Sequence, residues 1–134
     1  MPLAQLIYTS RPFGFDEATL DDILTTARVK NAQSNITGAL ICRADLYMQM
    51  LEGPRQALTE TFGRILRDDR HVEVRLVHCA DTSERLFPQW SMRDDPPQSW
   101  MWNQAEVRAG AARLAPSIEA LGVFRRLATL PKDA

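Results

Sequence analysis

The chain has 134 residues, with 16 basic and 17 acidic side chains and a formal net charge of −1 at pH 7. This length suits one compact domain that buries its core without disulfides or metal, and the balanced charge argues against a nucleic-acid-binding or a basic membrane-binding surface. The N-terminus lacks a signal-peptide pattern and no apolar run approaches the roughly 20 residues that cross a bilayer, so we expect a cytoplasmic protein.

The N-terminal segment predicts a strand and then an amphipathic helix. Ala4 to Thr9 form an apolar run that is typical of a strand, and residues 11–14 have turn chemistry. Asp16 can cap a helix whose apolar residues recur at helical spacing, namely Leu20, Ile23, Leu24 and Ala27. We expect this helix over about residues 16–31.

A hairpin and a second helix follow. The apolar runs 36–42 and 46–52 are separated by three residues, which is short enough for two antiparallel strands. Gly53 and Pro54 open a helix whose inner face is expected to carry Leu58, Phe62, Ile65 and Leu66. Another strand is expected over residues 72–80.

The two cysteines, Cys42 and Cys79, fall within these apolar runs and lack CxxC spacing. We therefore expect both to be buried, reduced thiols rather than a disulfide or a pair of metal ligands.

The C-terminal third predicts one more strand and a helical tail. Residues 85–92 are expected to form a fifth strand, which Pro88 would confine to a sheet edge or a bulge. Residues 94–99 break the pattern, and two short amphipathic helices split at Pro116 follow, with apolar residues at Val107, Ala111, Leu114, Ile118, Leu121 and Phe124. We expect this tail to pack on the free face of the sheet, and any uncovered part of that face would be a partner or dimer surface.

The order strand-helix-strand-strand-helix-strand, with the added strand, predicts an α+β fold of the ferredoxin-like type. Such a fold has an antiparallel sheet with both helices on one face and right-handed crossovers.

Two polar side chains interrupt the predicted strands. Gln49 lies in the apolar run 46–51, and Tyr8 lies in the first strand. A buried amide left unpaired costs roughly 1–3 kcal/mol, so both ends of the Gln49 amide need partners, and a phenol on a neighbouring strand can be one of them. Taken alone, Tyr8 is better explained as a core residue with a solvated hydroxyl, but together the two residues predict a small buried polar site.

Several short motifs stand in an order and spacing that closely resemble the BLUF family of flavin-binding blue-light sensors. They are Tyr8, Asn31, Ile36-Thr37-Gly38, Gln49 with Leu51-Glu52-Gly53, Arg70-His71 and Phe87-Pro88-Gln89-Trp90-Ser91-Met92. Each motif alone is weak, and their joint occurrence over about residues 3–93 is specific. The resemblance implies a photosensor domain over residues 1–93, with a hinge and a helical extension over residues 94–134.

The resemblance also implies where the flavin lies. The isoalloxazine ring would rest on the sheet between the two helices, with Tyr8 and Gln49 beside it and Asn31 at its carbonyl edge. Ile23 and Ile65 would sandwich the ring, although both are also expected in the core. Without the resemblance, Asn31 would be explained as a helix C-cap.

Four charged or titratable residues are candidates for the polar part of the cofactor. Arg64 matches a family arginine near the ribityl and phosphate groups, where a guanidinium suits a phosphate. Family members often carry asparagine or histidine where this chain has Lys30, which could still reach the pyrimidine carbonyl or the phosphate. Arg70 and His71 are also candidates, although basic groups at a helix C-terminus are equally explained as a solvated surface.

The resemblance implies a reversible hydrogen-bond switch. Tyr8 would give an electron and its proton to the light-excited flavin along the path through Gln49, and both would return after the Gln49 amide has rotated or tautomerised. The flavin would then be left in its ground state with a stronger hydrogen bond to C4=O, and its absorption would shift to the red until it relaxed thermally. Trp90 and Met92, expected on the same side of an extended segment, would relay the change.

The implied cofactor is FAD, with FMN or riboflavin as alternatives, and no enzymatic activity is expected of a chain whose tail is too short for an output enzyme. The switch would act on a downstream signalling protein by protein–protein contact, and a homodimer or higher oligomer is expected. Two alternatives on the same fold are a flavin-dependent redox enzyme and a light-insensitive interaction module.

Overall fold

The protein is a β-α-β-β-α-β unit to which a short fifth strand and two C-terminal helices are added. The computed structural model describes residues 3–12, 17–43, 46–68, 71–95, 101–102, 104–112 and 114–130. The elements are β1 (Leu3–Pro12), α1 (Glu17–Gln33), β2 (Thr37–Arg43), β3 (Leu46–Pro54), α2 (Arg55–Arg67), β4 (His71–Thr82), β5 (Arg93–Asp95), α3 (Gln104–Arg108) and α4 (Ser117–Ala128). The ferredoxin-like α+β fold predicted from the sequence is confirmed.

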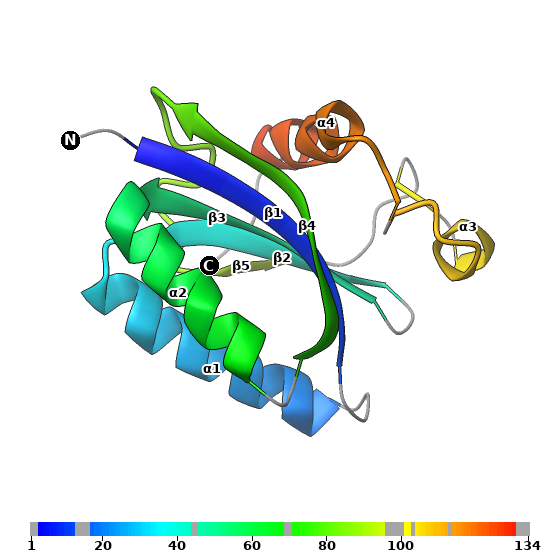
Figure 1. The fold of residues 1–134 in the computed structure, drawn as a ribbon, viewed down its shortest axis with the longest axis horizontal. Coiled ribbons are helices and arrows are strands. Elements are labelled where there is room, and N and C mark those ends of the chain that lie inside the picture. Colours follow the sequence, from blue (N-terminus) through cyan, green and yellow to red (C-terminus); the bar gives the residue numbers. More distant parts are fainter. Residues whose placement is uncertain are drawn as a thin grey trace.

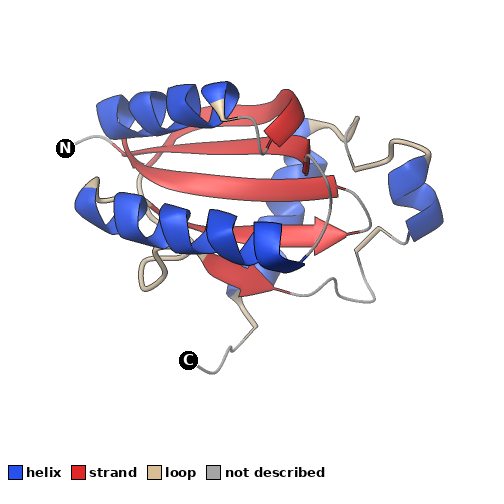
Figure 2. Cartoon of the chain, turned by 90° about the horizontal axis from the view of Figure 1, so that it is seen from below, coloured by secondary structure: helices blue, strands red, loops and turns tan. Residues whose placement is uncertain are grey.

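The strands form one sheet in the order β4-β1-β3-β2-β5. The pairs among β1 to β4 are antiparallel, and β5 lies parallel to β2 at one edge. Helices α1 and α2 cover one face of the sheet, whereas α4 lies across the other (Figures 1 and 2). The pairing of β1 with β3 places Tyr8 directly opposite Gln49.

Alternation along the strands builds two separate cores. Leu6 and Tyr8 face the helices α1 and α2, while Ile7 between them faces the opposite side. On that opposite side α4 contributes its buried stripe, which consists of Ala120, Leu121, Phe124 and Leu127. Helix α4 therefore packs on the second face of the sheet.

Two apolar residues of the tail lie elsewhere than predicted. Ile118 is 78% exposed and Leu114 is 55% exposed, so neither belongs to an inner face. The reason for Ile118 is its position, because it stands in the first turn of α4 on a different side of the helix from the stripe through Phe124 and Leu127.

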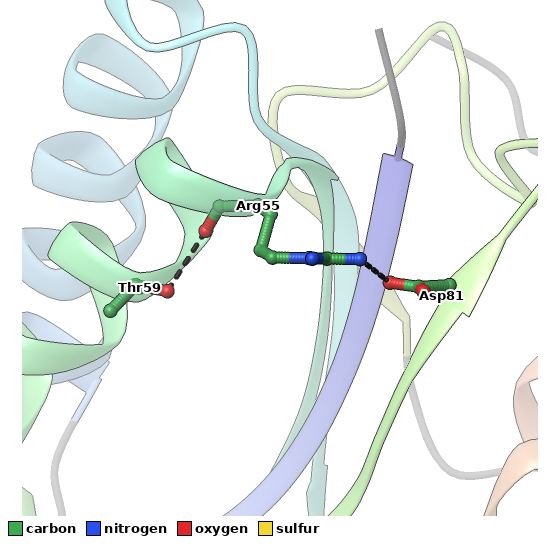
Figure 3. Close-up of polar contacts among 3 residues, drawn as sticks. All are labelled: Arg55, Thr59 and Asp81. Carbon is green, nitrogen blue, oxygen red and sulfur yellow. Dashed lines mark hydrogen bonds and ion pairs between the residues drawn. The ribbon is translucent and has the colours of Figure 1, made fainter.

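The start of α2 is tied to β4. Arg55, which follows the predicted Gly53-Pro54 opening, extends across β1 and pairs with the Asp81 carboxylate at 2.5 Å (Figure 3). The Thr59 hydroxyl donates to the Arg55 carbonyl one turn earlier at 2.9 Å. Both partners of the ion pair are largely exposed, so we assign it only a small share of the stability.

Two motif glycines stand where backbones pass closely. A Cβ on Gly38 would overlap the carbonyl oxygen of Met50 on the neighbouring strand. A Cβ on Gly53 would lie 2.8 Å from the carbonyl oxygen of Asn35. These contacts explain why the Ile-Thr-Gly and Leu-Glu-Gly motifs end in glycine.

The fifth strand was predicted at the wrong residues. Residues 85–92 form turns and bends, and the strand consists of Arg93–Asp95. The buried Glu52 carboxylate accepts hydrogen bonds from the backbone N–H groups of Leu86 at 2.7 Å and Phe87 at 2.8 Å, which removes these groups from any strand pairing. Pro88 follows at once and has no N–H to donate.

The prediction for the cysteines was half right. Neither Cys42 nor Cys79 is in a disulfide, but Cys42 is only half-buried and Cys79 is exposed, because Cys79 belongs to the edge strand β4. Among the described helices, none combines the length and the apolar character that a membrane span requires. The described residues also contain no cluster of three or more side chains suited to hold a metal ion.

Candidate functional site

A cavity lies between α1 and α2 and has the centre of the sheet as its floor. Its lining residues come from β1, α1, β3 and α2 and the residue after α2, namely Tyr8, Ile23, Thr26, Ala27, Lys30, Asn31, Gln49, Leu51, Thr61, Arg64, Ile65 and Asp68. The structure thus brings together seven of the predicted site residues, although they are spread over four secondary-structure elements.

The floor of the cavity carries a hydrogen-bonded pair. The hydroxyl of Tyr8 donates to Oε1 of Gln49, and both side chains are almost completely buried. The two residues face each other on directly paired positions of β1 and β3, so their side chains leave the sheet on the same face. The buried polar site predicted from the two strand interruptions is therefore present.

The other end of the Gln49 amide is also occupied. Its Nε2 donates to the sulfur of Met92 at 3.2 Å. Because a thioether sulfur only accepts and a phenol donates to the amide oxygen, the two partners specify one orientation of the amide. Both ends of the amide are satisfied, as the cost of burying it requires.

Burial raises the pKa of the Tyr8 phenol well above its ordinary value, and the nearby Asp68 carboxylate raises this pKa further. The phenol therefore keeps its proton throughout the neutral range and acts as the donor in its bond with Gln49. The Phe62 ring lies 5.5 Å from the Tyr8 ring, centroid to centroid, and covers it on the α2 side.

Asn31 is held toward the segment before β5. It is buried, and its Nδ2 donates to the Ser91 carbonyl at 2.9 Å. Its own carbonyl accepts from Ile36 N at 2.9 Å, and α1 continues to Gln33. Asn31 is therefore an inward-pointing residue in the last turns of α1 rather than the helix C-cap.

The two helices supply aliphatic walls and cations. Ile23 from α1 and Ile65 from α2 line the cavity, and so do Lys30 and Arg64. The Arg64 guanidinium also donates to the Thr61 hydroxyl at 3.3 Å. Apolar walls with amides on the floor and cations at the helix ends fit a flat heteroaromatic ring that carries a polar, anionic extension.

The side chains of two predicted cofactor contacts, Arg70 and His71, are not among those that the structure describes. Arg70 lies outside the described residues, and only the backbone of His71 is described, as the first residue of β4.

The prediction that Trp90 and Met92 share a side was wrong. Met92 is buried against Gln49 in the core under α1 and α2, whereas Trp90 is half-buried against the core on the α4 face. The alternation of an extended strand does not apply, because residues 88–92 turn and bend. The backbone carbonyl of Trp90 accepts a hydrogen bond from the Gly38 N–H at 3.0 Å, which joins this segment to β2.

Several lining residues were missed by the sequence analysis. Thr26 and Ala27 lie three and four positions after Ile23 on α1, so helical spacing from Ile23 identifies them. Thr61 stands four positions before Ile65 on α2 by the same rule. Asp68 is the C-cap residue that follows α2, and in the sequence it is one of four consecutive charged residues, 67–70.

Comparison with known proteins gives a consistent result. The family model described as "BLUF: Sensors of blue-light using FAD" matches residues 3–93. The chain is 42% identical over 74 residues to photoactivated adenylate cyclase subunit beta of Euglena gracilis, an alignment that covers 54% of this chain and 9% of that protein. The photoactivated adenylate cyclase subunit beta-like protein FB of the same organism is 35% identical over 91 residues, an alignment that covers 67% of this chain and 10% of that protein.

Solved structures agree in fold. The dark-state structure of BlrB, a BLUF protein, has a TM-score of 0.78 and 30% identity, covering 95% of this chain and 96% of that one. The ground state of BlsA has a TM-score of 0.84 at 23% identity, covering 98% of this chain and 91% of that one, and shares the fold. The chain spans about a tenth of the length of the curated cyclase relatives.

Proposed function

The chain belongs to the BLUF family, the sensors of blue light using FAD, and from this premise we propose that Tyr8 and Gln49 form its photoactive pair. The observation that carries the proposal is the buried chain of hydrogen bonds from the Tyr8 hydroxyl through the Gln49 amide to Met92, located on the floor of a cavity between two helices. The output of this pair is a reversible change in hydrogen bonding rather than a turnover of substrate.

The cavity residues are suited to hold FAD. Ile23 and Ile65 would flank the ring, and the amides of Asn31 and Gln49 offer both donors and acceptors to its polar edge. Lys30 and Arg64 line the same cavity and would face the ribityl and phosphate end, with Arg70 and His71 as further candidates. FMN or riboflavin would satisfy the same ring contacts.

When bound, FAD supplies a ring that absorbs blue light and accepts an electron once excited. Tyr8 is placed to lose that electron together with its phenolic proton, because its hydroxyl already donates to Oε1 of Gln49. The amide would then rotate or tautomerise, and the electron and the proton would return to Tyr8. The flavin would be left chemically unchanged, so the changed hydrogen bonding of Gln49 would be the stored signal.

The output goes to a protein partner. Relatives of this chain are subunits of photoactivated adenylate cyclases, in which the matched part is a small share of the protein. We expect this chain to act as the sensor for a separate or linked effector, without an enzymatic site of its own in the described residues. A cytoplasmic location and a homodimer or higher oligomer belong to the same proposal.

The test is the visible absorption spectrum of the flavin-loaded protein in the dark, after a blue flash and after a return to darkness. If Tyr8 and Gln49 are the photoactive pair, the flavin bands should move to longer wavelength after the flash and recover in darkness. A bound flavin with no reversible shift would refute it.

A further inference from the structure

Arg93 is a buried cation that holds the end of α4. It opens β5, only 5% of its surface is exposed, and its Nη2 donates to the Leu130 carbonyl at 3.0 Å. Leu130 lies just after α4, and its N–H closes the last turn by donating to the Leu127 carbonyl at 3.0 Å. Leu130 follows the C-cap residue Thr129, so Arg93 holds the chain immediately after α4 rather than a carbonyl of the helix itself.

Met92, the residue before Arg93, is hydrogen-bonded by residues on the cavity side of the sheet. Gln49 Nε2 donates to Met92 Sδ at 3.2 Å, and Arg28 Nε donates to the Met92 carbonyl at 3.2 Å. Met92 belongs to the core under α1 and α2, whereas the Arg93 side chain lies in a groove formed with Leu130 and other residues of the α4 side. Two consecutive residues thus connect the photoactive amide to the opposite face of the sheet.

We propose that Arg93 is a positioning residue that couples the orientation of the Gln49 amide to the C-terminal end of α4, so that light loosens this end of the helix. The inference rests on the proposed function, because it needs the amide to reorient. It deepens that function by naming the element that changes and the contact through which it changes.

The coupling follows from the chemistry of the two contacts. In the dark the amide NH2 group donates to Met92 Sδ, and a thioether sulfur has no proton to give in return. After reorientation the amide oxygen would face this sulfur, so two acceptors would be in contact and Met92 would have to withdraw. Arg93 is joined to Met92 by one peptide bond, and a displacement there lengthens its hydrogen bond to Leu130.

Hydrogen–deuterium exchange of the flavin-loaded protein, in the dark and under continuous blue light, tests the inference. In the wild-type protein, light should accelerate exchange of the Thr129 and Leu130 amides by roughly tenfold, the factor that corresponds to about 1.4 kcal/mol. The amides of β1 and β3 should not change. Unchanged exchange at the end of α4, in a protein whose absorption does shift, would overturn the inference and leave the proposed function intact.

A variant separates the contact from the photochemistry. Arg93→Met removes the donor and keeps an unbranched chain that fills the buried space. This variant should retain the red shift, should exchange faster than wild type at residues 129–130 in the dark, and should show no further acceleration in light. Arg55→Met is the matched control, since Arg55 pairs with Asp81 on β4 and should leave the response of α4 as in wild type.

The outcomes are distinct. If Arg93→Met still shows the full light-dependent acceleration, then Arg93 does not carry the coupling. If the variant does not fold, the wild-type comparison between dark and light still tests whether the end of α4 responds, and an absent response there overturns the inference. If no absorption shift occurs in the wild-type protein, the proposed function fails first.

Discussion

The hydroxyl of Tyr8 and the amide oxygen of Gln49 meet as donor and acceptor on directly paired positions of β1 and β3, with both side chains buried. The Gln49 amide has one orientation, because the Tyr8 hydroxyl donates to its oxygen and its nitrogen donates to the Met92 sulfur. An amide held in this way has a second orientation with its two ends exchanged, which is the basis of a two-state element.

Replacing Tyr8 with phenylalanine should abolish the red-shifted state and leave flavin binding intact. The cavity walls are unchanged, but the donor to Gln49 Oε1 is lost. The buried oxygen then lacks this partner, so the free energy of unfolding should fall by about 1–3 kcal/mol. Absorption before and after a blue flash, together with urea unfolding, measures both effects.

The control for this experiment is Tyr47→Phe, because Tyr47 is the other tyrosine of the chain, is equally buried, and does not line the cavity. This control should keep the reversible shift. A normal photocycle in the Tyr8→Phe protein would show that Tyr8 is not the donor.

Replacing Gln49 with leucine should also eliminate the shift, because leucine has no amide that could exchange its ends. Flavin absorption should persist with no light-minus-dark difference. Gln5→Leu is the matched control, since Gln5 is a buried glutamine of β1 whose Nε2 lies 3.2 Å from His78 Nε2 and outside the cavity. A shift that survives in Gln49→Leu would place the switch elsewhere.

Glu52 predicts a pH dependence of stability. Burial raises the pKa of its carboxyl above the ordinary value of 4.5, although the N–H groups of Leu86 and Phe87 and the charge of Arg85 act to lower it. Above pH 4.5 the unfolded chain releases this proton while the folded protein still holds it. The contribution of Glu52 is therefore complete at lower pH and declines as the pH rises through the raised folded-state pKa.

Glu52→Gln isolates this effect. The difference in unfolding free energy between wild type and Glu52→Gln, measured by denaturant titration at several pH values, should decrease as the pH rises from 4.5. Glutamine presents one acceptor oxygen to two N–H groups, so we expect a loss of about 1–3 kcal/mol at the acidic end. A difference that is constant or grows with pH would contradict the assignment.

Gly38→Ala should destabilise the protein by about 3 kcal/mol or more, because the added methyl group overlaps the Met50 carbonyl oxygen and the backbone of β3 must move. Gly122→Ala should have the opposite effect on stability, because an added methyl group at this position meets no other atom. Nothing lies within 4 Å of a Cβ at Gly122, which stands inside α4, so alanine should stabilise by about 0.5–1 kcal/mol. Thermal unfolding of both variants measures whether stability falls for Gly38→Ala and rises for Gly122→Ala. Equal changes in stability would refute the steric explanation.

Local patterns were enough to predict the four antiparallel strands, the two helices on one face of the sheet and the pairing of Tyr8 with Gln49. The two-residue period of strands predicted the positions of Tyr8 and Gln49. The helical period placed Ile23 and Ile65 on inner faces correctly, but it was wrong for Leu66, which is 54% exposed. The course of residues 85–92 was not predictable in this way, since it depends on Glu52, a carboxylate far away in sequence that binds two consecutive N–H groups. Trp90 and Met92 lie on opposite sides because residues 88–92 turn and bend instead of continuing as a strand.

In the proposed photocycle, light changes the hydrogen bonds of the Gln49 amide and leaves the flavin chemically unchanged. The most direct measurement is the light-minus-dark infrared difference spectrum of the flavin-loaded protein, followed through recovery in darkness. We predict that the flavin C4=O stretch moves to lower frequency, as a stronger hydrogen bond requires, and returns fully in the dark. A C4=O band that does not move, or a flavin that is bleached in the light state, would contradict the account.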